Sequence, residues 1–193
     1  MKISKNDVLI ILPISFLVIF GLIMITSSSI YIADDMTSNP FYFAQRQAFF
    51  IAIGILSLSL FLILPSDFLF KFDWVFMLLS ILLLIILFIP DVGTSVNGSI
   101  RWIRIGPINI QPTEICKFSL ILYISGYSVR RMTEINSLRS FLKPLILLFV
   151  ISILIMGQPD LGSTAIICIL VVGILFYAGI SFFQFILLLL LIV

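Results

Sequence analysis

Six long stretches without a charged residue divide this chain of 193 residues. A helix needs about 20 apolar residues to cross the hydrocarbon core of a bilayer, because in lipid the backbone must satisfy its hydrogen bonds internally. Only 10% of the residues are charged and 62% are hydrophobic, which is outside the range of soluble domains. The sequence therefore predicts an all-α, polytopic integral membrane protein. The uncharged stretches are 8–33, 47–66, 74–90, 118–129, 144–159 and 161–193.

These stretches predict a single transmembrane domain over residues 1–193, with six transmembrane helices and a truncated seventh. The fourth stretch has only 12 residues, and it becomes a span only if it starts near Pro112 and includes Glu114 and Lys117. The last stretch is long enough for one complete helix and the start of another. The predicted spans are about 8–33, 41–64, 74–90, 112–129, 144–158, 161–179 and, in part, 182–193.

Polar residues followed by proline mark three predicted helix starts. A proline at the first helical position loses no hydrogen bond that the helix would have made. The connection after residue 90 also contains the segment RWIRIGPINI, with β-branched residues on both sides of Gly106-Pro107. This pattern predicts a small hairpin or an interfacial strip on the outer side. The three pairs are Asn39-Pro40, Gln111-Pro112 and Gln158-Pro159.

The distribution of lysine and arginine predicts a cytoplasmic N-terminus, because cytoplasmic loops carry the excess of basic residues. In this orientation seven basic residues lie inside and four outside. The stretch 130–143 then becomes a basic cytoplasmic loop, which sets the topology; a second interpretation is docking to anionic lipid or to a cytoplasmic partner. The inner set is Lys2, Lys5, Lys71, Arg130, Arg131, Arg139 and Lys143, and the outer set is Arg46, Arg101, Arg104 and Lys117.

The composition also excludes several kinds of chemistry. The chain has no histidine, so acid–base catalysis by histidine and the usual zinc and haem ligands are absent from it. A net charge of +2 is too small and too dispersed for a nucleic-acid surface. Cys116 and Cys168 lie in apolar segments without a CxxC motif, which indicates packing rather than a disulfide or a metal site.

Charged residues within or at the ends of spans are the candidates for function, because each costs about 2.5–3.5 kcal/mol at the centre of a membrane helix. Glu114 and Lys117 lie three residues apart on one helical face, where they form a local ion pair or line a polar cavity that meets an anionic ligand group. Arg46, flanked by Gln45 and Gln47, either snorkels to the headgroups or faces the same kind of cavity.

Asp160 follows Gln158-Pro159 at the start of the sixth predicted span. A carboxylate in the first turn of a helix is explained by capping and by the helix dipole. Against this simple reading stands the density of unusual residues at membrane depth, where irregular backbone is tolerated only against protein or a water-filled cavity. Two outer basic groups and two carboxylates therefore suggest a cavity that opens outward and holds an anionic amphiphile.

Two segments resemble the signature regions of the SEDS family, the shape, elongation, division and sporulation proteins (FtsW, RodA and SpoVE). They are NGSIRWIRIGPINIQPTEICKFSLILYIS at 97–125 and QPDLGST at 158–164, separated by a basic cytoplasmic loop. Further upstream, MITSSSIYIA at 24–33 and SNPFYFAQRQ at 38–47 resemble the division-specific FtsW branch more than the elongation-specific RodA branch.

The resemblance implies a bundle of about ten transmembrane helices and a peptidoglycan glycosyltransferase activity in cell division. The family polymerises lipid II, a disaccharide-peptide on undecaprenyl diphosphate, on the outer face of the cytoplasmic membrane and works with a class B penicillin-binding transpeptidase. Cations or a divalent metal near the departing diphosphate would stabilise its charge, and a carboxylate would serve as the base. No cofactor is identified in the sequence. Localisation at the division septum is also implied.

Position by position, the resemblance predicts substrate-binding roles for Arg46, Arg101, Gln111, Glu114, Lys117 and Asp160. One departure is Asn109, where many members carry a basic residue. The family's catalytic Asp lies in an outer loop between the seventh and eighth helices, so no catalytic residue is expected within these 193 residues. Asp160 belongs to a different motif. Because the apolar end after Ser181 is too short to span, we expect the 193-residue product alone to be unstable and inactive.

Three hypotheses follow from the sequence and the resemblance. The first is the N-terminal part of a lipid II polymerase, contributing substrate-cavity residues. The second is a lipid II flippase, because a polar cavity between helices also suits a transporter. The third is a non-catalytic division scaffold. Polymerisation in detergent distinguishes the first two, because transport has no meaning without two membrane sides.

Overall fold

The chain is described here by a computed structural model that covers residues 5–192 except 91, 97–98 and 107. The chain forms two compact units, Met1–Pro65 and Ser66–Val193. The expectation of a single transmembrane domain stays a prediction.

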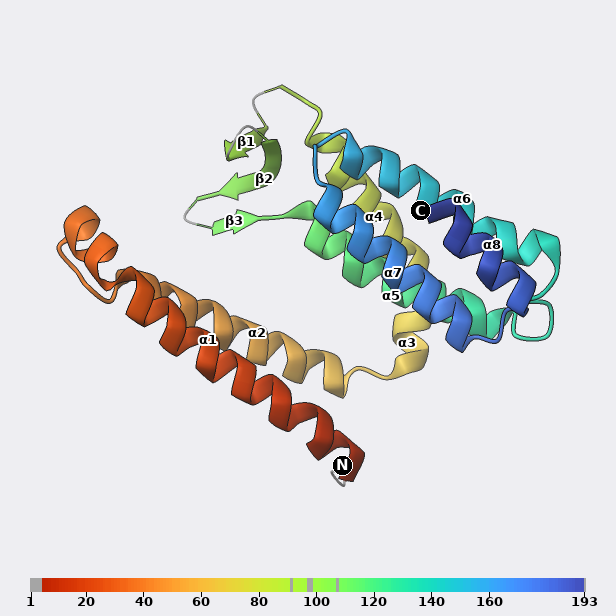
Figure 1. The fold of residues 1–193 in the computed structure, drawn as a ribbon, viewed down its shortest axis with the longest axis horizontal. Coiled ribbons are helices and arrows are strands. Elements are labelled where there is room, and N and C mark those ends of the chain that lie inside the picture. Colours follow the sequence, from red (N-terminus) through yellow and green to blue (C-terminus); the bar gives the residue numbers. More distant parts are fainter. Residues whose placement is uncertain (1–4, 91, 97–98, 107, 193) are drawn as a thin grey trace. The chain divides into compact units, whose positions relative to one another are not determined.

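The first unit is a pair of antiparallel helices, α1 (Lys5–Thr37) and α2 (Tyr42–Ile63) (Figure 1). No residue of α2 is buried, and apolar side chains are exposed all around both helices. Helices that are apolar on every face are typical of lipid surroundings. The turn between them contains the predicted Asn39-Pro40 pair, and the Asn39 side chain accepts a hydrogen bond from the backbone N–H of Phe41 at 3.0 Å.

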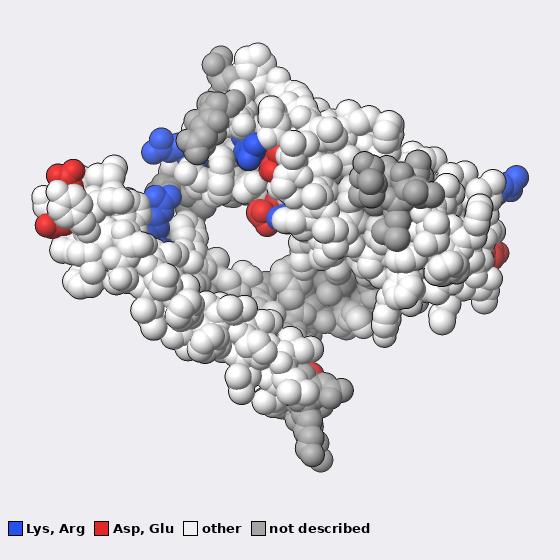
Figure 2. All heavy atoms as spheres, in the orientation of Figure 1, with Lys and Arg blue, Asp and Glu red and all other residues white. Residues whose placement is uncertain are grey.

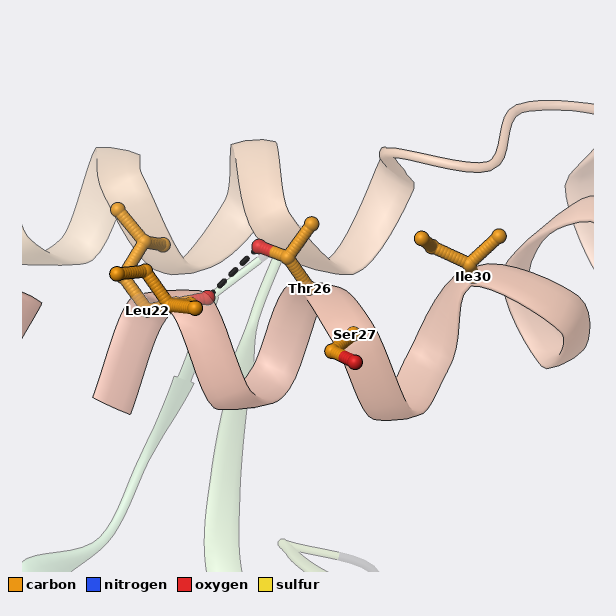
Figure 3. Close-up of a pocket in the computed structure, with 5 residues that line it drawn as sticks. Leu22, Thr26, Ser27 and Ile30 are labelled. Atoms are coloured by element: carbon orange, nitrogen blue, oxygen red, sulfur yellow. Dashed lines mark hydrogen bonds between the residues drawn. The ribbon is translucent and has the colours of Figure 1, made fainter. Parts of the chain in front are cut away.

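Several hydroxyl groups on α1 and α2 donate to carbonyls of their own helix. Thr26 donates to the carbonyl of Leu22 at 2.7 Å, as Figure 3 shows, and Ser29 donates to the carbonyl of Ile25 at 2.7 Å. Ser57 makes the same contact with Ile53 at 2.9 Å. A polar group with an internal partner is tolerated in lipid. The pocket around Thr26 in Figure 3 is lined by Leu22, Ile23, Thr26, Ser27 and Ile30.

The second unit packs helices around one apolar core. Its helices are α3 (Ser66–Lys71), α4 (Asp73–Ile86), α5 (Pro112–Arg130), α6 (Leu138–Met156), α7 (Leu161–Tyr177) and α8 (Phe182–Ile192). In Figure 1, α4, α5, α6 and α7 lie alongside one another, and α5 and α7 begin at the same end of the unit. The core side chains that are fully buried include Leu84, Leu120, Ile124, Ile151, Ile155, Ile167 and Val171.

A small antiparallel sheet fills the connection between α4 and α5. Its strands are β1 (Gly93–Val96), β2 (Ser99–Ile105) and β3 (Ile108–Ile110), in the order β1-β2-β3. Ile105 pairs with Ile108 across the turn that contains Gly106, whose φ of +59° suits glycine. The segment RWIRIGPINI thus forms the hairpin, while β1 was not anticipated from the sequence.

Three helix bounds differ from the predicted spans by four residues or more, the first being the end of α1 at Thr37 rather than 33. α6 begins at Leu138 rather than 144, because Ser137 caps it: its hydroxyl accepts from the backbone N–H of Ser140 at 3.3 Å. Pro144 lies inside this helix and has no N–H for the carbonyl of Ser140, which accepts instead from the Tyr127 hydroxyl at 3.0 Å. α4 ends at Ile86 rather than 90, because the chain tightens into i,i+3 turns there: the N–H groups of Phe88 and Ile89 donate to the carbonyls of Ile85 and Ile86 at 3.0 Å.

Within the described residues, three helices are long and apolar enough, by length and composition, to cross a membrane: α1 from Asp7, α2 and α6. α4 and α7 are shorter apolar helices. α5 has 19 residues and starts at Pro112. It includes Glu114 and Lys117 near its start, which is the condition under which the sequence predicted a span here.

A buried ion pair joins α3, α4 and α5 at the end of the unit where α5 finishes. Arg130 Nη1 lies 2.8 Å from Asp73 Oδ2, and the same nitrogen donates to the carbonyl of Phe70 at 3.0 Å. Asp73 is 1% exposed, and the contact is an ion pair rather than a well-aligned hydrogen bond. Gly126 makes room for it, because a Cβ there would lie 2.3 Å from Asp73 Oδ2.

We expect Gly126→Ala to destabilise the protein by about 1–3 kcal/mol, the usual cost of forcing atoms into a packed site. Gly173→Ala is the matched control, because a Cβ on Gly173 would meet nothing within 4 Å and alanine favours helix by up to about 1 kcal/mol. Thermal unfolding in detergent measures both. Equal midpoints for the two variants would show that the close approach at Gly126 has no energetic importance.

Candidate functional site

The candidate site lies at the end of the second unit where α5 and α7 begin, beside the small sheet (Figure 1). Charged side chains are few on the face shown in Figure 2, and most of that surface is uncharged. Five residues with predicted substrate-binding roles lie on these elements. Arg101 is in β2, Gln111 directly precedes α5, Glu114 and Lys117 are in the first turns of α5, and Asp160 directly precedes α7.

Glu114 and Lys117 form an ion pair on the first turns of α5. Lys117 Nζ lies 2.6 Å from Glu114 Oε1. The lysine side chain is only 16% exposed, whereas the glutamate side chain is 58% exposed. An ammonium group carries three donors and this contact uses one of them, so Lys117 retains the capacity to bind an anionic oxygen.

Gln111 and Pro112 start α5 as the sequence predicted. Gln111 occupies the N-cap position with extended backbone, and its carbonyl accepts from the N–H of Glu114 at 3.0 Å. Its side chain makes no capping hydrogen bond. The next residue, Thr113, is fully buried, and its hydroxyl has no hydrogen-bond partner among the described residues. A half-buried amide and a buried hydroxyl thus begin the same helix.

Arg101 reaches from β2 to the connection between α6 and α7. Its Nε donates to the carbonyl of Gln158 at 3.3 Å, and its Nη2 donates to the carbonyl of Pro159. Its Nη1 lies 3.8 Å from Asp160 Oδ1. Segments 57–59 residues apart in sequence are therefore joined by one guanidinium, whose side chain is 32% exposed.

Asp160 caps α7 in addition to facing Arg101. One carboxylate oxygen accepts from the backbone N–H of Ser163 at 3.1 Å, and the other accepts from the Ser163 hydroxyl at 2.8 Å. The carboxylate is nearly buried. The simple capping interpretation is thus realised, and its geometry is compatible with a charge contact to Arg101.

Two substitutions separate these two roles of Asp160. We expect Asp160→Ala to lower stability by about 1–2 kcal/mol, because the cap and the acceptor for Ser163 are both lost. Asp160→Asn keeps an oxygen for the Ser163 N–H and should cost less than half as much. Thermal unfolding of both variants in detergent checks this, and an asparagine variant as unstable as the alanine variant would mean that the charge facing Arg101 dominates.

Gln158 anchors the same connection to α4. Its side-chain amide donates to the carbonyl of Leu84 at 3.2 Å, and only 3% of the residue is exposed. Its Oε1 is buried and has no hydrogen-bond partner within the described part of the chain. Gln158 therefore ties the connection to α4 by a hydrogen bond, and Asp160 caps α7.

Arg46 lies on α2, in the first unit. It is exposed, and its guanidinium carbon lies 5.9 Å from the ring centre of Phe50 one turn later. The neighbouring Gln45 accepts from the side-chain amide of Asn39 at 3.4 Å. The predicted role of Arg46 in substrate binding stays a prediction, as do those of the five residues in the second unit.

Sequence reasoning missed the Asp73–Arg130 pair. Asp73 stands at the edge of an apolar run and was passed over, and Arg130 was assigned only to the basic loop. The two residues are 57 positions apart on different helices, so no periodicity connects them. The small residue Gly126, one turn before Arg130, is the one local signal of a close approach, and it acquires meaning only when the packing is known.

Comparisons with known proteins agree with this fold. The family model described as "Cell cycle protein" (FtsW, RodA, SpoVE) matches residues 7–193. The chain is 41% identical over 175 residues to a probable peptidoglycan glycosyltransferase FtsW of Allochromatium vinosum, covering 90% of this chain and 44% of that protein. It is 38% identical over 180 residues to a protein of the same name from Legionella pneumophila, covering 93% and 46%.

Solved structures show the same architecture. The rod shape determining protein RodA of Thermus thermophilus superposes with a TM-score of 0.69 at 24% identity, covering 91% of this chain and 57% of that one. A structure described as "Structural coordination of polymerization and crosslinking by a peptidoglycan synthase complex" superposes with a TM-score of 0.66, covering 90% and 50%.

The fold and the matched motifs define a helical, polytopic membrane protein of the SEDS type. The chain belongs to the FtsW/RodA/SpoVE family of cell cycle proteins, and its curated relatives carry the name FtsW. This confirms the resemblance and the α-helical membrane fold expected from the sequence. The chain spans less than half the length of the two relatives described above.

Proposed function

We propose that this chain contributes the N-terminal helices of a peptidoglycan glycosyltransferase of cell division, which polymerises lipid II on the outer face of the cytoplasmic membrane. The observation that carries the proposal is the 41% identity over 90% of the chain to a probable peptidoglycan glycosyltransferase FtsW. The activity is proposed for the whole protein, because the matched region is less than half of that relative.

The cations of the candidate site suit the leaving group of this reaction. When the glycan is transferred, the diphosphate of the donor departs with negative charge, and positioned cations stabilise that charge. Lys117, which is mostly shielded from solvent, and Arg101, which is partly exposed, are the basic groups of the site in the second unit. Shielding from water strengthens the interaction of Lys117 with an anion.

The carboxylates of this site are placed to position other side chains. Glu114 is held by Lys117 at 2.6 Å, and Asp160 is held by Ser163 and faces Arg101. Both carboxylates thus already have protein partners that fix their positions. We therefore assign Glu114 and Asp160 to orienting the two cations, and assign removal of the acceptor proton to neither.

A divalent metal at the diphosphate is part of the same proposal, with a limited role for the residues described. Among these residues there is no group of three or more histidine, cysteine, aspartate or glutamate side chains that could hold a metal ion. Glu114 and Asp160 are moreover engaged by basic side chains. The described residues thus do not form a metal site of their own, and no step is assigned to a metal here.

The proposed location is the inner membrane at the division septum, and the proposed partner is a class B penicillin-binding transpeptidase. The membrane-spanning helices and the relatives named FtsW support the location. The partner is supported by the likeness to a chain in a structure described as a peptidoglycan synthase complex that coordinates polymerisation and crosslinking.

Replacement of the host's own FtsW tests this function in cells. The complete gene that encodes this chain is expressed in Escherichia coli depleted of FtsW, and cell length and the position of a fluorescent fusion are recorded. We expect short cells and a signal at mid-cell. Persistent filaments, with the protein present in the membrane, would contradict the proposal.

The same strain separates an enzyme from a scaffold. Lys117→Gln should leave the protein at mid-cell but abolish division, because binding of the donor is weakened while contacts to other division proteins remain. Arg131→Gln is the matched control, since Arg131 also forms an i,i+3 ion pair at 2.6 Å, with Glu134, at the other end of α5. Normal division with Lys117→Gln would favour the scaffold.

A further inference from the structure

A pocket lies between α3, the start of α4 and the end of α5, at the end of the second unit opposite the candidate functional site. Its volume is about 410 Å³. Lys117 and Arg130 are 13 residues apart on α5, which corresponds to about 20 Å along a helix, so this pocket is distinct from the candidate functional site. The predicted orientation places it at the cytoplasmic face. Its lining residues are Phe70, Lys71, Asp73, Trp74, Tyr123 and Arg130.

The pocket carries net positive charge. Lys71 and Arg130 contribute two positive charges and Asp73 one negative charge. The contacts of Arg130 with Asp73 and with the carbonyl of Phe70 both involve Nη1, whereas a guanidinium has five N–H donors. The Arg130 side chain is 48% exposed although its partner Asp73 is buried. Asp73 thus fixes the guanidinium in place, and donors remain for an anion.

Aromatic side chains form the apolar part of the same lining. Trp74 is 57% exposed and Tyr123 is half-buried. Tryptophan and tyrosine are enriched at the level of lipid headgroups, because each has an apolar ring and a polar group. Two cations beside one exposed and one half-buried aromatic ring match a ligand with a phosphate group attached to an apolar body. A free phosphate ion would use only the cations.

We propose that this pocket binds the headgroup of an anionic phospholipid of the cytoplasmic leaflet. Lys71 and the free donors of Arg130 hold the phosphate, and Trp74 and Tyr123 contact the glycerol and the first part of the acyl chains. Asp73 positions Arg130. The lipid would therefore lie against the junction where α3 joins α4 to the end of α5.

Quenching of Trp74 fluorescence tests the proposal. The product of the complete gene is placed in phosphatidylcholine nanodiscs with increasing amounts of phosphatidylglycerol brominated near the glycerol, and the signal of a Trp74→Phe variant is subtracted. We expect saturable quenching by phosphatidylglycerol and weaker quenching by brominated phosphatidylcholine. Lys71→Gln should raise the half-saturating fraction about fivefold, the effect of one basic residue near an anionic surface, and Lys71→Arg should restore it.

The control variant is Arg139→Gln, which removes one exposed positive charge from α6 at the same membrane face without touching the pocket. We expect it to change the half-saturating fraction less than twofold. Equal effects of Lys71→Gln and Arg139→Gln would overturn the proposal in favour of general surface attraction, and so would equal quenching by the two brominated lipids. Relief of quenching by millimolar inorganic phosphate would assign the pocket to a soluble phosphate instead. Lys71→Gln leaves the Asp73–Arg130 pair intact, so loss of folding does not confuse the result.

Discussion

Replacing Lys117 by glutamine should lower the rate of lipid II polymerisation by about 10²-fold or more. Removal of one preorganised charge or donor from a transition-state site costs about 10²–10³ in rate. Lys117 is less exposed than Arg101, the other basic group of the candidate site, and its ion pair with Glu114 fixes it at the start of α5. The measurement is the rate of glycan synthesis by the purified product of the complete gene.

The control for this variant is again Arg131→Gln, in which an ion pair of the same spacing and length is broken. Exposed pairs of this kind contribute about 0–1 kcal/mol, so both rate and stability should stay close to the parent protein. A Lys117→Gln protein that is folded and polymerises within threefold of the parent rate would exclude Lys117 from the substrate site.

Replacing Arg130 by glutamine should destabilise the protein by about 3 kcal/mol. Asp73 is 1% exposed, and breaking a buried pair by removal of one partner costs about 3–5 kcal/mol, because the remaining charge is left without compensation. We expect the lower end of that range, since Arg130 itself is 48% exposed. Unfolding of the purified protein in detergent measures the loss.

Replacing Asp73, the other partner of this ion pair, should cost much less stability. Asp73→Asn leaves Arg130 charged but partly exposed to solvent, so about 1 kcal/mol is expected. The double variant, with neither charge, should regain most of the stability lost in Arg130→Gln. Equal losses from the two single substitutions, and their simple addition in the double variant, would show that burial of Asp73 is not the source of the effect.

The membrane fold was predictable because it follows from local properties. Long uncharged runs predicted helical spans, and Gln111-Pro112 marked the start of α5. Pro159 lies just before α7 instead of at its first position, because Asp160 is the N-cap and the helix begins at Leu161. The start of α6 was placed too late because the uncharged run begins only at Pro144, after Lys143, whereas the helix begins at Leu138. The hydroxyl of Tyr127, 17 residues earlier, satisfies the carbonyl that this proline leaves without a donor, and no local pattern reveals such a contact.

The candidate site was predictable only in part, because local patterns do not reveal contacts between segments that are far apart in the sequence. The i,i+3 spacing of Glu114 and Lys117 predicted their pairing, and the position of Asp160 after a proline predicted its cap. The contact of Arg101 with the segment 158–160 depends on the path of the sheet between α4 and α5, so spacing could not indicate it. The Asp73–Arg130 junction likewise depends on the packing of three helices at Gly126.

Polymerisation of lipid II in detergent tests the central proposal most directly. The product of the complete gene is purified together with its class B penicillin-binding partner and incubated with lipid II, and glycan strands are separated by length. We expect lipid II to be converted into strands, since transfer requires no membrane sides. Unchanged lipid II in detergent, together with movement of lipid II across vesicles that contain the protein, would contradict the glycosyltransferase and establish a transporter.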